Sequence, residues 1–240
     1  MNSSTESSAA ASQSLEASTA TEATAVKSRP DRRQKILDAS RRLFGRFGYH
    51  AVTIRQIAAE ANVPLALVGY YFGQKQELYD AIFAHSNGTV AQRSVDLRES
   101  LAGSKGEQLQ RIVSAMVLPV VRMRDSAQGE SYALFLTRGL TQQGVEEDRA
   151  IRKFLDPLST EFISALHGAL AHEYPGFTHA QAAWGFQFAL GAILHYLSDQ
   201  RVGRLSNGVN TAGDPAVEKQ LVAFILHGLR GVAQSFTAAA

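Results

Sequence analysis

The segment TIRQIAAEANVPLALVGYYFGQK, residues 53–75, carries the signals of two short helices separated by a turn. Thr53 and Gln56 have the spacing of a capping box, in which each side chain bonds the backbone N–H of the other residue. Asn62-Val63-Pro64 then interrupts the helix, because Asn tolerates the left-handed backbone that ends a helix and Pro suits the first turn of the next one. Residues 65–72 are predicted to form that second helix.

Two short helices about a three-residue turn form a helix-turn-helix, whose second helix enters the major groove of DNA. Helical hairpins that bind no nucleic acid share this pattern, so the segment alone leaves both interpretations open. The charge distribution favours DNA: residues 29–80 carry nine Lys and Arg against five Asp and Glu, whereas residues 81–240 carry fourteen of each. A solvated basic face is the alternative, but the excess positive charge lies where a phosphate backbone would attract it.

The composition of the 240 residues excludes several classes of protein. A hydrophobic content of 45% is globular, and no apolar run approaches the ~20 residues of a membrane span. The absence of cysteine excludes disulfides, thiolate metal sites and cysteine nucleophiles. Residues 1–28 consist largely of Ser, Ala and Thr, so we expect a disordered tail there. This tail lacks the features of a secretory signal, and we expect a cytoplasmic protein with no membrane partner.

The rest of the chain reads as helical throughout, which predicts an all-α fold. Asp31 with Gln34 is expected to cap a first helix that ends at Gly48. Beyond residue 83 the apolar periodicity predicts one long helix over 76–101 and loops at 142–148 and 203–213. Pro119 is expected to kink or end its helix. Further helices are predicted at 107–121, 130–139, 156–170, 178–198 and 214–236.

The segment RRQKILDASRRLFGRFGYHAVTIRQIAAEANVPLALVGYYFGQKQELY resembles the N-terminal domain of the TetR family of bacterial transcriptional repressors. Two departures concern the turn and the second helix: Asn62 stands where the family usually has Gly, and Pro64 where it often has Ser or Thr. The matching positions are Ile36-Leu37, Leu43-Phe44, Gly48-Tyr49, Thr53, Ile57-Ala58, Ala61-Asn62-Val63, Tyr71-Phe72, Lys75 and Leu78.

The resemblance implies a three-helix DNA-binding domain over residues 29–83 and a helical ligand-binding and dimerisation domain over 84–240. The second helix of the motif is poor in the Arg, Asn and Gln side chains that make bidentate contacts with bases, so DNA shape is expected to add selectivity. Contacts with bases or phosphates are expected from Thr53, Arg55, Leu65, Ala66, Leu67, Gly69, Tyr70, Tyr71 and Lys75.

By the same resemblance, helices 178–198 and 214–236 would pair with those of a second subunit as a four-helix bundle. A central position in the core of a monomer is the alternative. A two-fold dimer would read a pseudo-palindromic operator with half-sites ~34–36 Å apart. The interface is expected to contain Trp184, Leu190, Leu221, Phe224, Ile225 and Gly228.

The family also places an effector pocket inside the C-terminal bundle, and the aromatic residues there suggest a small hydrophobic or aromatic effector. Ordinary core packing explains the same residues equally well. The pocket candidates are Tyr132, Phe135, Phe162, Trp184, Phe188, His195 and Tyr196.

No motif in the sequence indicates catalysis, a metal site or a cofactor. His167, His172 and His179 lie near one another in sequence, but their spacing does not match H-E-x-x-H and Pro175-Gly176 interrupts them. The sequence therefore predicts a homodimeric repressor that an effector releases from its operator. One alternative is a protein of this fold that stays on DNA as a platform for another protein, without an effector. A small helical enzyme is a remote alternative.

Overall fold

The computed structural model describes residues 32–85, 87–123, 126–142, 144–211 and 214–237. All regular elements in these ranges are helical, which confirms the predicted all-α fold. The expected disordered tail over residues 1–28 and the expected cap at Asp31 lie outside the described ranges. Among the described helices, none combines the length and apolar character that crossing a membrane requires.

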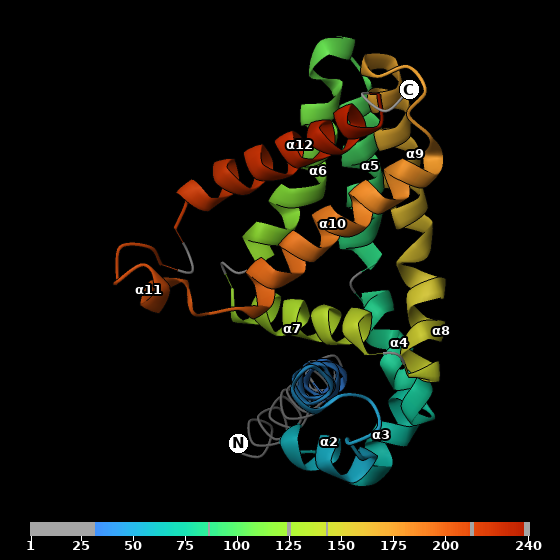
Figure 1. The fold of residues 1–240 in the computed structure, drawn as a ribbon. Helices are drawn as coiled ribbons and strands as arrows, with labels where there is room; N and C mark the ends of the chain where they lie inside the picture. The colour runs from blue at the N-terminus through green and yellow to red at the C-terminus, as the bar shows by residue number, and fades with distance from the viewer. Residues whose placement is uncertain (1–31, 86, 124–125, 143, 212–213, 238–240) are drawn as a thin grey trace, which may run out of the picture.

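The N-terminal head consists of a helix over residues 32–47, α2 (Ile54–Glu60) and α3 (Leu65–Phe72), at the bottom of Figure 1. The predicted capping box is present: Gln56 N donates to Thr53 Oγ1 at 3.3 Å, and Thr53 N donates to Gln56 Oε1 at 2.8 Å. Asn62 has a φ of 52°, the left-handed conformation that the turn requires. The predicted helix-turn-helix is therefore confirmed.

Residues 76–101, which were expected to form one long helix, contain α4 (Lys75–His85) and α5 (Asn87–Leu101). These helices lie on either side of residue 86, which is outside the described ranges.

The body bears on three further predictions. Helix α8 begins inside the predicted loop 142–148: its first turn holds three acidic residues and its last turn Arg152 and Lys153, the charge order that the helix dipole favours. Pro119 does not end its helix, because α6 continues past it to Arg122. Helix α11 (Val202–Leu205) overlaps the start of the predicted loop 203–213. The elements are η1 (Lys105–Glu107), α6 (Gln108–Arg122), α7 (Ala127–Thr141), α8 (Val145–Phe154), α9 (Asp156–Glu173), α10 (His179–Ser198), α11 (Val202–Leu205) and α12 (Ala216–Thr237).

Two hydrophobic cores organise the described residues. The body core lies among α5, α6, α9, α10 and α12. The second core, which we call the junction core, joins the head and α4 to α7 and α8. At its centre the ring of Phe83 lies 4.9 Å from that of Phe135 and stacks at 5.5 Å on Phe154. The head therefore packs directly on the body.

Candidate nucleic-acid interface

Helix α3 packs on the head through one face and exposes the other. Val68 and Phe72, four residues apart, are buried in the junction core. The opposite face carries Leu65, Ala66, Gly69 and Tyr70, all exposed, and Tyr70 is 74% exposed. A helix that leaves its apolar and aromatic side chains in solvent has a free face for a partner such as a DNA groove.

The N-terminus of α2 borders this free face and forms a shallow open depression with it. The depression has a volume of about 530 Å³ and is lined by Thr53, Ile54, Arg55, Leu65 and Gly69. A Cβ atom at Gly69 would meet no atom within 4 Å, so a bound molecule can approach the α3 backbone closely. Arg55 is exposed and makes no ion pair with any described residue. Its charge is available to a phosphate.

The other residues predicted to contact DNA are partly buried or already engaged in contacts within the chain. The Thr53 hydroxyl is engaged in the capping box and also donates to Gln56 Oε1 at 2.9 Å. Leu67 and Tyr71 are partly buried. Lys75 Nζ lies 4.2 Å from the centre of the Tyr49 ring. Burial lowers the pKa of Lys75, and the carboxylates of Glu146 and Glu147 act in the opposite direction.

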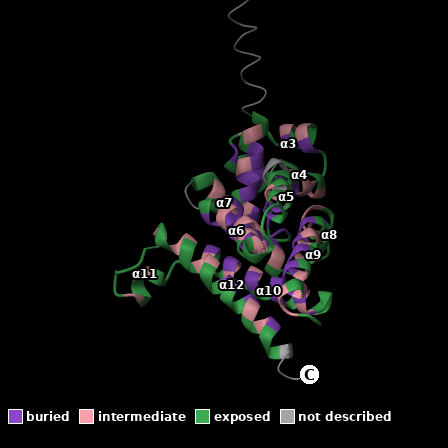
Figure 2. Cartoon of the chain, turned by 90° about the horizontal axis from the view of Figure 1, so that it is seen from above, coloured by how far each residue is buried: buried purple, intermediate pink, exposed green. Residues whose placement is uncertain are grey.

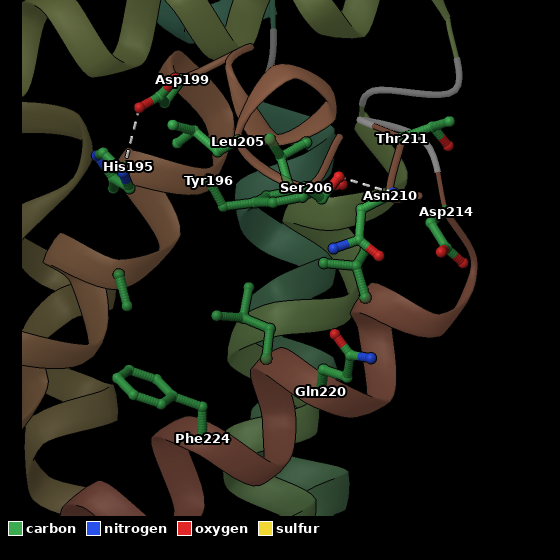
Figure 3. Close-up of a pocket in the computed structure, with 14 residues that line it drawn as sticks. His195, Tyr196, Asp199, Leu205, Ser206, Asn210, Thr211, Asp214, Gln220 and Phe224 are labelled. Carbon is green, nitrogen blue, oxygen red and sulfur yellow. Dashed lines mark hydrogen bonds and ion pairs between the residues drawn. The ribbon is translucent and has the colours of Figure 1, made fainter. Parts of the chain in front are cut away.

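The seven predicted pocket residues do not share one cavity. Tyr132 and Phe135 are buried in the junction core, whereas Trp184 and Phe188 are exposed on α10. His195 and Tyr196 line a cavity of about 650 Å³ between α10, the α11 segment and α12, which we call the outer cavity (Figure 3). Phe162 lines a separate cavity of about 70 Å³, the inner cavity, which α5, α6, α7, α9 and α10 enclose.

The inner cavity contains one charged residue, Arg93 of α5, which the sequence analysis missed. Its guanidinium lies 5.7 Å from the centre of the Phe162 ring, and its Nη2 donates to the Met116 carbonyl at 3.3 Å. Its buried Nε has no hydrogen-bond partner among the described residues. Burial lowers the pKa of Arg93, while Tyr132 and Asp96 act in the opposite direction. The available signal was an arginine within the apolar stripe of Val90 and Leu97.

The outer faces of α10 and α12 carry an exposed apolar surface. Trp184 stacks on Phe188 at 5.8 Å and is 64% exposed, and Phe224 is 69% exposed. Figure 2 shows the exposed positions along α12. Ile225 departs from the expected interface: it is 3% exposed because it points into the body core of its own chain. Gly228 is exposed, while Leu190 lines the inner cavity and Leu221 the outer one.

The histidines considered in the sequence make local contacts. His167 Nε2 lies 3.1 Å from the Phe177 carbonyl oxygen, and the rings of His167 and His179 meet edge to face at 5.8 Å. These contacts join the end of α9 to the start of α10. They give His167 and His179 a structural reason to lie close together.

Comparison with known proteins agrees with this architecture. Residues 36–82 match the model of bacterial regulatory proteins of the tetR family, and residues 114–228 match that of the tetracyclin repressor-like C-terminal domain. The HTH-type transcriptional regulator BetI of Brucella anthropi is 30% identical over 145 residues, which are 60% of this chain and 72% of BetI. The regulator HbdR of an Aromatoleum species is 44% identical over 48 residues, about a fifth of each chain.

Solved structures share the fold at low identity. The regulator FadR of Bacillus subtilis, solved with stearoyl-CoA, superposes with a TM-score of 0.55 at 17% identity, covering 81% of this chain and 98% of FadR. AmtR of Mycobacterium smegmatis superposes with a TM-score of 0.55 at 19% identity, covering 82% and 85% of the two chains. With a helix-turn-helix head, a helical body and matches to both domain models, this chain belongs to the TetR family of DNA-binding transcriptional regulators.

Proposed function

We propose that this regulator is a homodimeric repressor that binds a pseudo-palindromic operator and is released by a small molecule. The observation that supports DNA binding is the exposed face of α3 beside Arg55, which makes no ion pair with any described residue. The exposed rings of Trp184, Phe188 and Phe224 support the dimer, because a monomer gains nothing by leaving them in water. Two copies related by a two-fold axis would present two α3 helices to half-sites ~34–36 Å apart.

The inner cavity is the proposed effector site, because Arg93 of α5 lines it and α5 follows α4, which packs on the head. Its walls are apolar apart from Arg93 and Ser159. An arginine whose buried Nε lacks a partner favours a ligand with an acidic group, since a charge-assisted hydrogen bond would satisfy it. The effector would thus have an apolar or aromatic body and an acidic group. The stearoyl-CoA of FadR is a molecule of this type, in a protein of the same fold.

The small size of the inner cavity implies that effector binding would move the helices around it. Its volume of about 70 Å³ is well below the ~300–1,000 Å³ of typical ligand pockets, so an effector would have to push its walls apart. Those walls include α5 and α7. To shift a population from 1:99 to 99:1, the effector must bind the DNA-incompetent state ~10⁴-fold more tightly. A cavity that is nearly closed in one state and open in the other supplies such a difference.

The outer cavity is the second candidate, favoured by its volume of about 650 Å³. Figure 3 shows His195, Tyr196 and Phe224 around it, with Asn210 and Gln220 as polar groups. Only α10, the α11 segment, the residues that follow it and α12 line this cavity, so a ligand there would act on the dimer face more directly than on the head.

The primary test is selection of bound sequences from a random DNA pool with the full-length protein at fixed salt. We expect a palindrome with two half-sites. Recovery of non-specific or AT-rich DNA alone would contradict operator binding and favour the alternative of a DNA-bound platform for another protein. We propose no catalytic activity, and turnover by purified protein that shifts no DNA would overturn this assignment.

Replacing Arg55 by Ala is expected to weaken binding to all DNA sequences and to reduce the slope of log affinity against log salt by about 1, because one phosphate contact is lost. Fluorescence anisotropy over a salt series measures both quantities. Arg204→Ala is the matched control, since Arg204 is an exposed arginine on α11 in the body. Equal slopes for the two variants would remove Arg55 from the interface.

Replacing Arg93 by Leu is expected to abolish a preference for acidic ligands. Wild-type protein should bind a fatty acid about 10-fold more tightly than the alcohol of equal chain length, because a hydrogen bond to a charged group contributes about 1.5–3 kcal/mol. Calorimetry on both ligands measures the ratio in wild type, Arg93→Leu and His195→Ala, the last altering the outer cavity. Loss of the preference in His195→Ala instead would identify the outer cavity as the effector site.

A further inference from the structure

Three potential metal ligands meet where the head touches α8. His50 lies in the turn after the helix over residues 32–47, and Glu146 and Glu147 lie in the first turn of α8. His50 Nε2 is 3.3 Å from Glu146 Oε2 and 3.8 Å from Glu147 Oε2. The ligand atoms of the three residues all lie within 4.8 Å of one another. None of the three residues lines the depression beside α3 or either of the two cavities.

Glu147 distinguishes this cluster from an ordinary group of surface acids. Its side chain is only 2% exposed, and its Oε2 receives no hydrogen bond from the described residues. The shielded Oε2 of Glu146 lacks a hydrogen-bond donor in the same way. A buried carboxylate is costly unless a charge or a donor compensates it. Lys75 is near enough to interact electrostatically with both carboxylates, but it donates no hydrogen bond to the two orphaned Oε2 atoms. These atoms lie on the side of His50, where a bound cation would compensate them directly.

The spacing of the three ligand atoms fits a metal ion. In a tetrahedral site with bonds of ~2.0–2.2 Å, two ligand atoms lie ~3.3–3.6 Å apart. The distance between His50 and Glu146 already has this value, and that between His50 and Glu147 exceeds it by a few tenths of an ångström. His50 is exposed, so its ring can adjust and a water molecule can take an open position.

Gly144 keeps the space beside these ligands clear. A Cβ atom at residue 144 would collide with Glu147 Oε2 and lie 3.2 Å from His50 Nε2. The ring of Tyr49 meets that of His50 edge to face at 5.3 Å and holds it beside α8. The backbone and an aromatic neighbour thus both leave the imidazole facing the two carboxylates.

We propose that His50, Glu146 and Glu147 bind one divalent first-row transition cation per chain, with Zn²⁺ as the probe. Imidazole nitrogen with carboxylate oxygen is a ligand set that such cations accept, whereas Mg²⁺ and Ca²⁺ prefer oxygen alone. Because one ligand belongs to the head and two belong to α8, the bound cation clamps the two parts together. The proposal does not rest on the operator or the effector.

The test is a calorimetric titration of full-length, metal-free protein with Zn²⁺, repeated with Mg²⁺. We expect one Zn²⁺ per chain and no comparable binding of Mg²⁺. His50→Ala and Glu147→Gln should each weaken Zn²⁺ binding by about tenfold or more. The exposed position of His50 makes the first variant safe for folding, and Gln preserves the shape of Glu147 in the second. A thermal melt should show that Zn²⁺ raises the Tm of wild type but not of His50→Ala.

His195→Ala is the matched control, because His195 Nε2 lies 3.4 Å from Asp199 Oδ2 in another histidine–carboxylate pair, on the surface of the body. This variant should bind Zn²⁺ as wild type does. Undiminished Zn²⁺ binding in His50→Ala would overturn the proposal, and so would loss of binding in His195→Ala. Absence of any Zn²⁺ binding by wild type would overturn the proposal as well.

Discussion

Replacing Phe83 by Ala is expected to lower the free energy of unfolding by about 3–5 kcal/mol, the usual cost of removing a buried aromatic side chain. Phe83 is 1% exposed and lies among the rings of Tyr79, Phe135 and Phe154, which come from α4, α7 and α8. Its removal would leave a void in the junction core that three packed helices cannot close. Chemical denaturation at a fixed protein concentration measures the change.

Phe47→Ala is the control for this substitution, because Phe47 also belongs to the head but is 48% exposed. Its replacement should change the stability by no more than about 0.5 kcal/mol, as is usual for surface positions. Similar losses in the two variants would mean that the junction core contributes no more to stability than the surface of the head does. A loss confined to Phe83→Ala supports the packing described above.

Replacing Phe224 by Asp is expected to convert the proposed dimer to monomers. An uncompensated charge buried in an interface costs about 3–5 kcal/mol, so the dimer dissociation constant should rise by about 10²–10³-fold. Operator affinity should fall with it, because a monomer contacts a single half-site. Analytical ultracentrifugation measures the association, and anisotropy with operator DNA measures the affinity.

Val209→Asp places the same charge at an exposed apolar residue of the segment that follows α11, outside the Trp184–Phe188–Phe224 surface. This variant should remain dimeric and should bind operator as wild type does. If Phe224→Asp leaves the dimer unchanged, Phe224 does not belong to the interface. The exposed rings of α10 and α12 would then serve another partner.

Local signals predicted the head and several helix boundaries. The capping box at Thr53 and the turn at Asn62 depend on residues a few positions apart, and the structure has both. The start of α8 was missed because the polar and acidic residues 142–148 were interpreted as a loop, although acids followed by bases are the charge order of a helix. Two ligands of the proposed metal site lie in that helix, so the same interpretation concealed the site.

Most features that could not be predicted from the sequence depend on tertiary contacts. The helical spacing of an aromatic residue predicts that it is buried, but it does not say in which core. Phe135 lies in the junction core, whereas Phe162 lies in the body core. Ile225 and Phe224 are neighbours in sequence, yet one faces the core and the other faces solvent. The meeting of His50 with Glu146 joins residues almost a hundred positions apart, which no local pattern encodes.

The junction core also sets the size of the moving part in any conformational change. Asp80 of α4 forms ion pairs with Arg149 at 2.9 Å and Lys153 at 3.2 Å, next to the stacked rings of Phe83 and Phe154. These contacts bind α4 to α8, so a movement of the head carries α4 and α8 with it. Helix α7 contributes Phe135 to the junction core and Leu136 and Leu140 to the wall of the inner cavity. A molecule that enlarges the inner cavity therefore pushes on a helix that also holds the head.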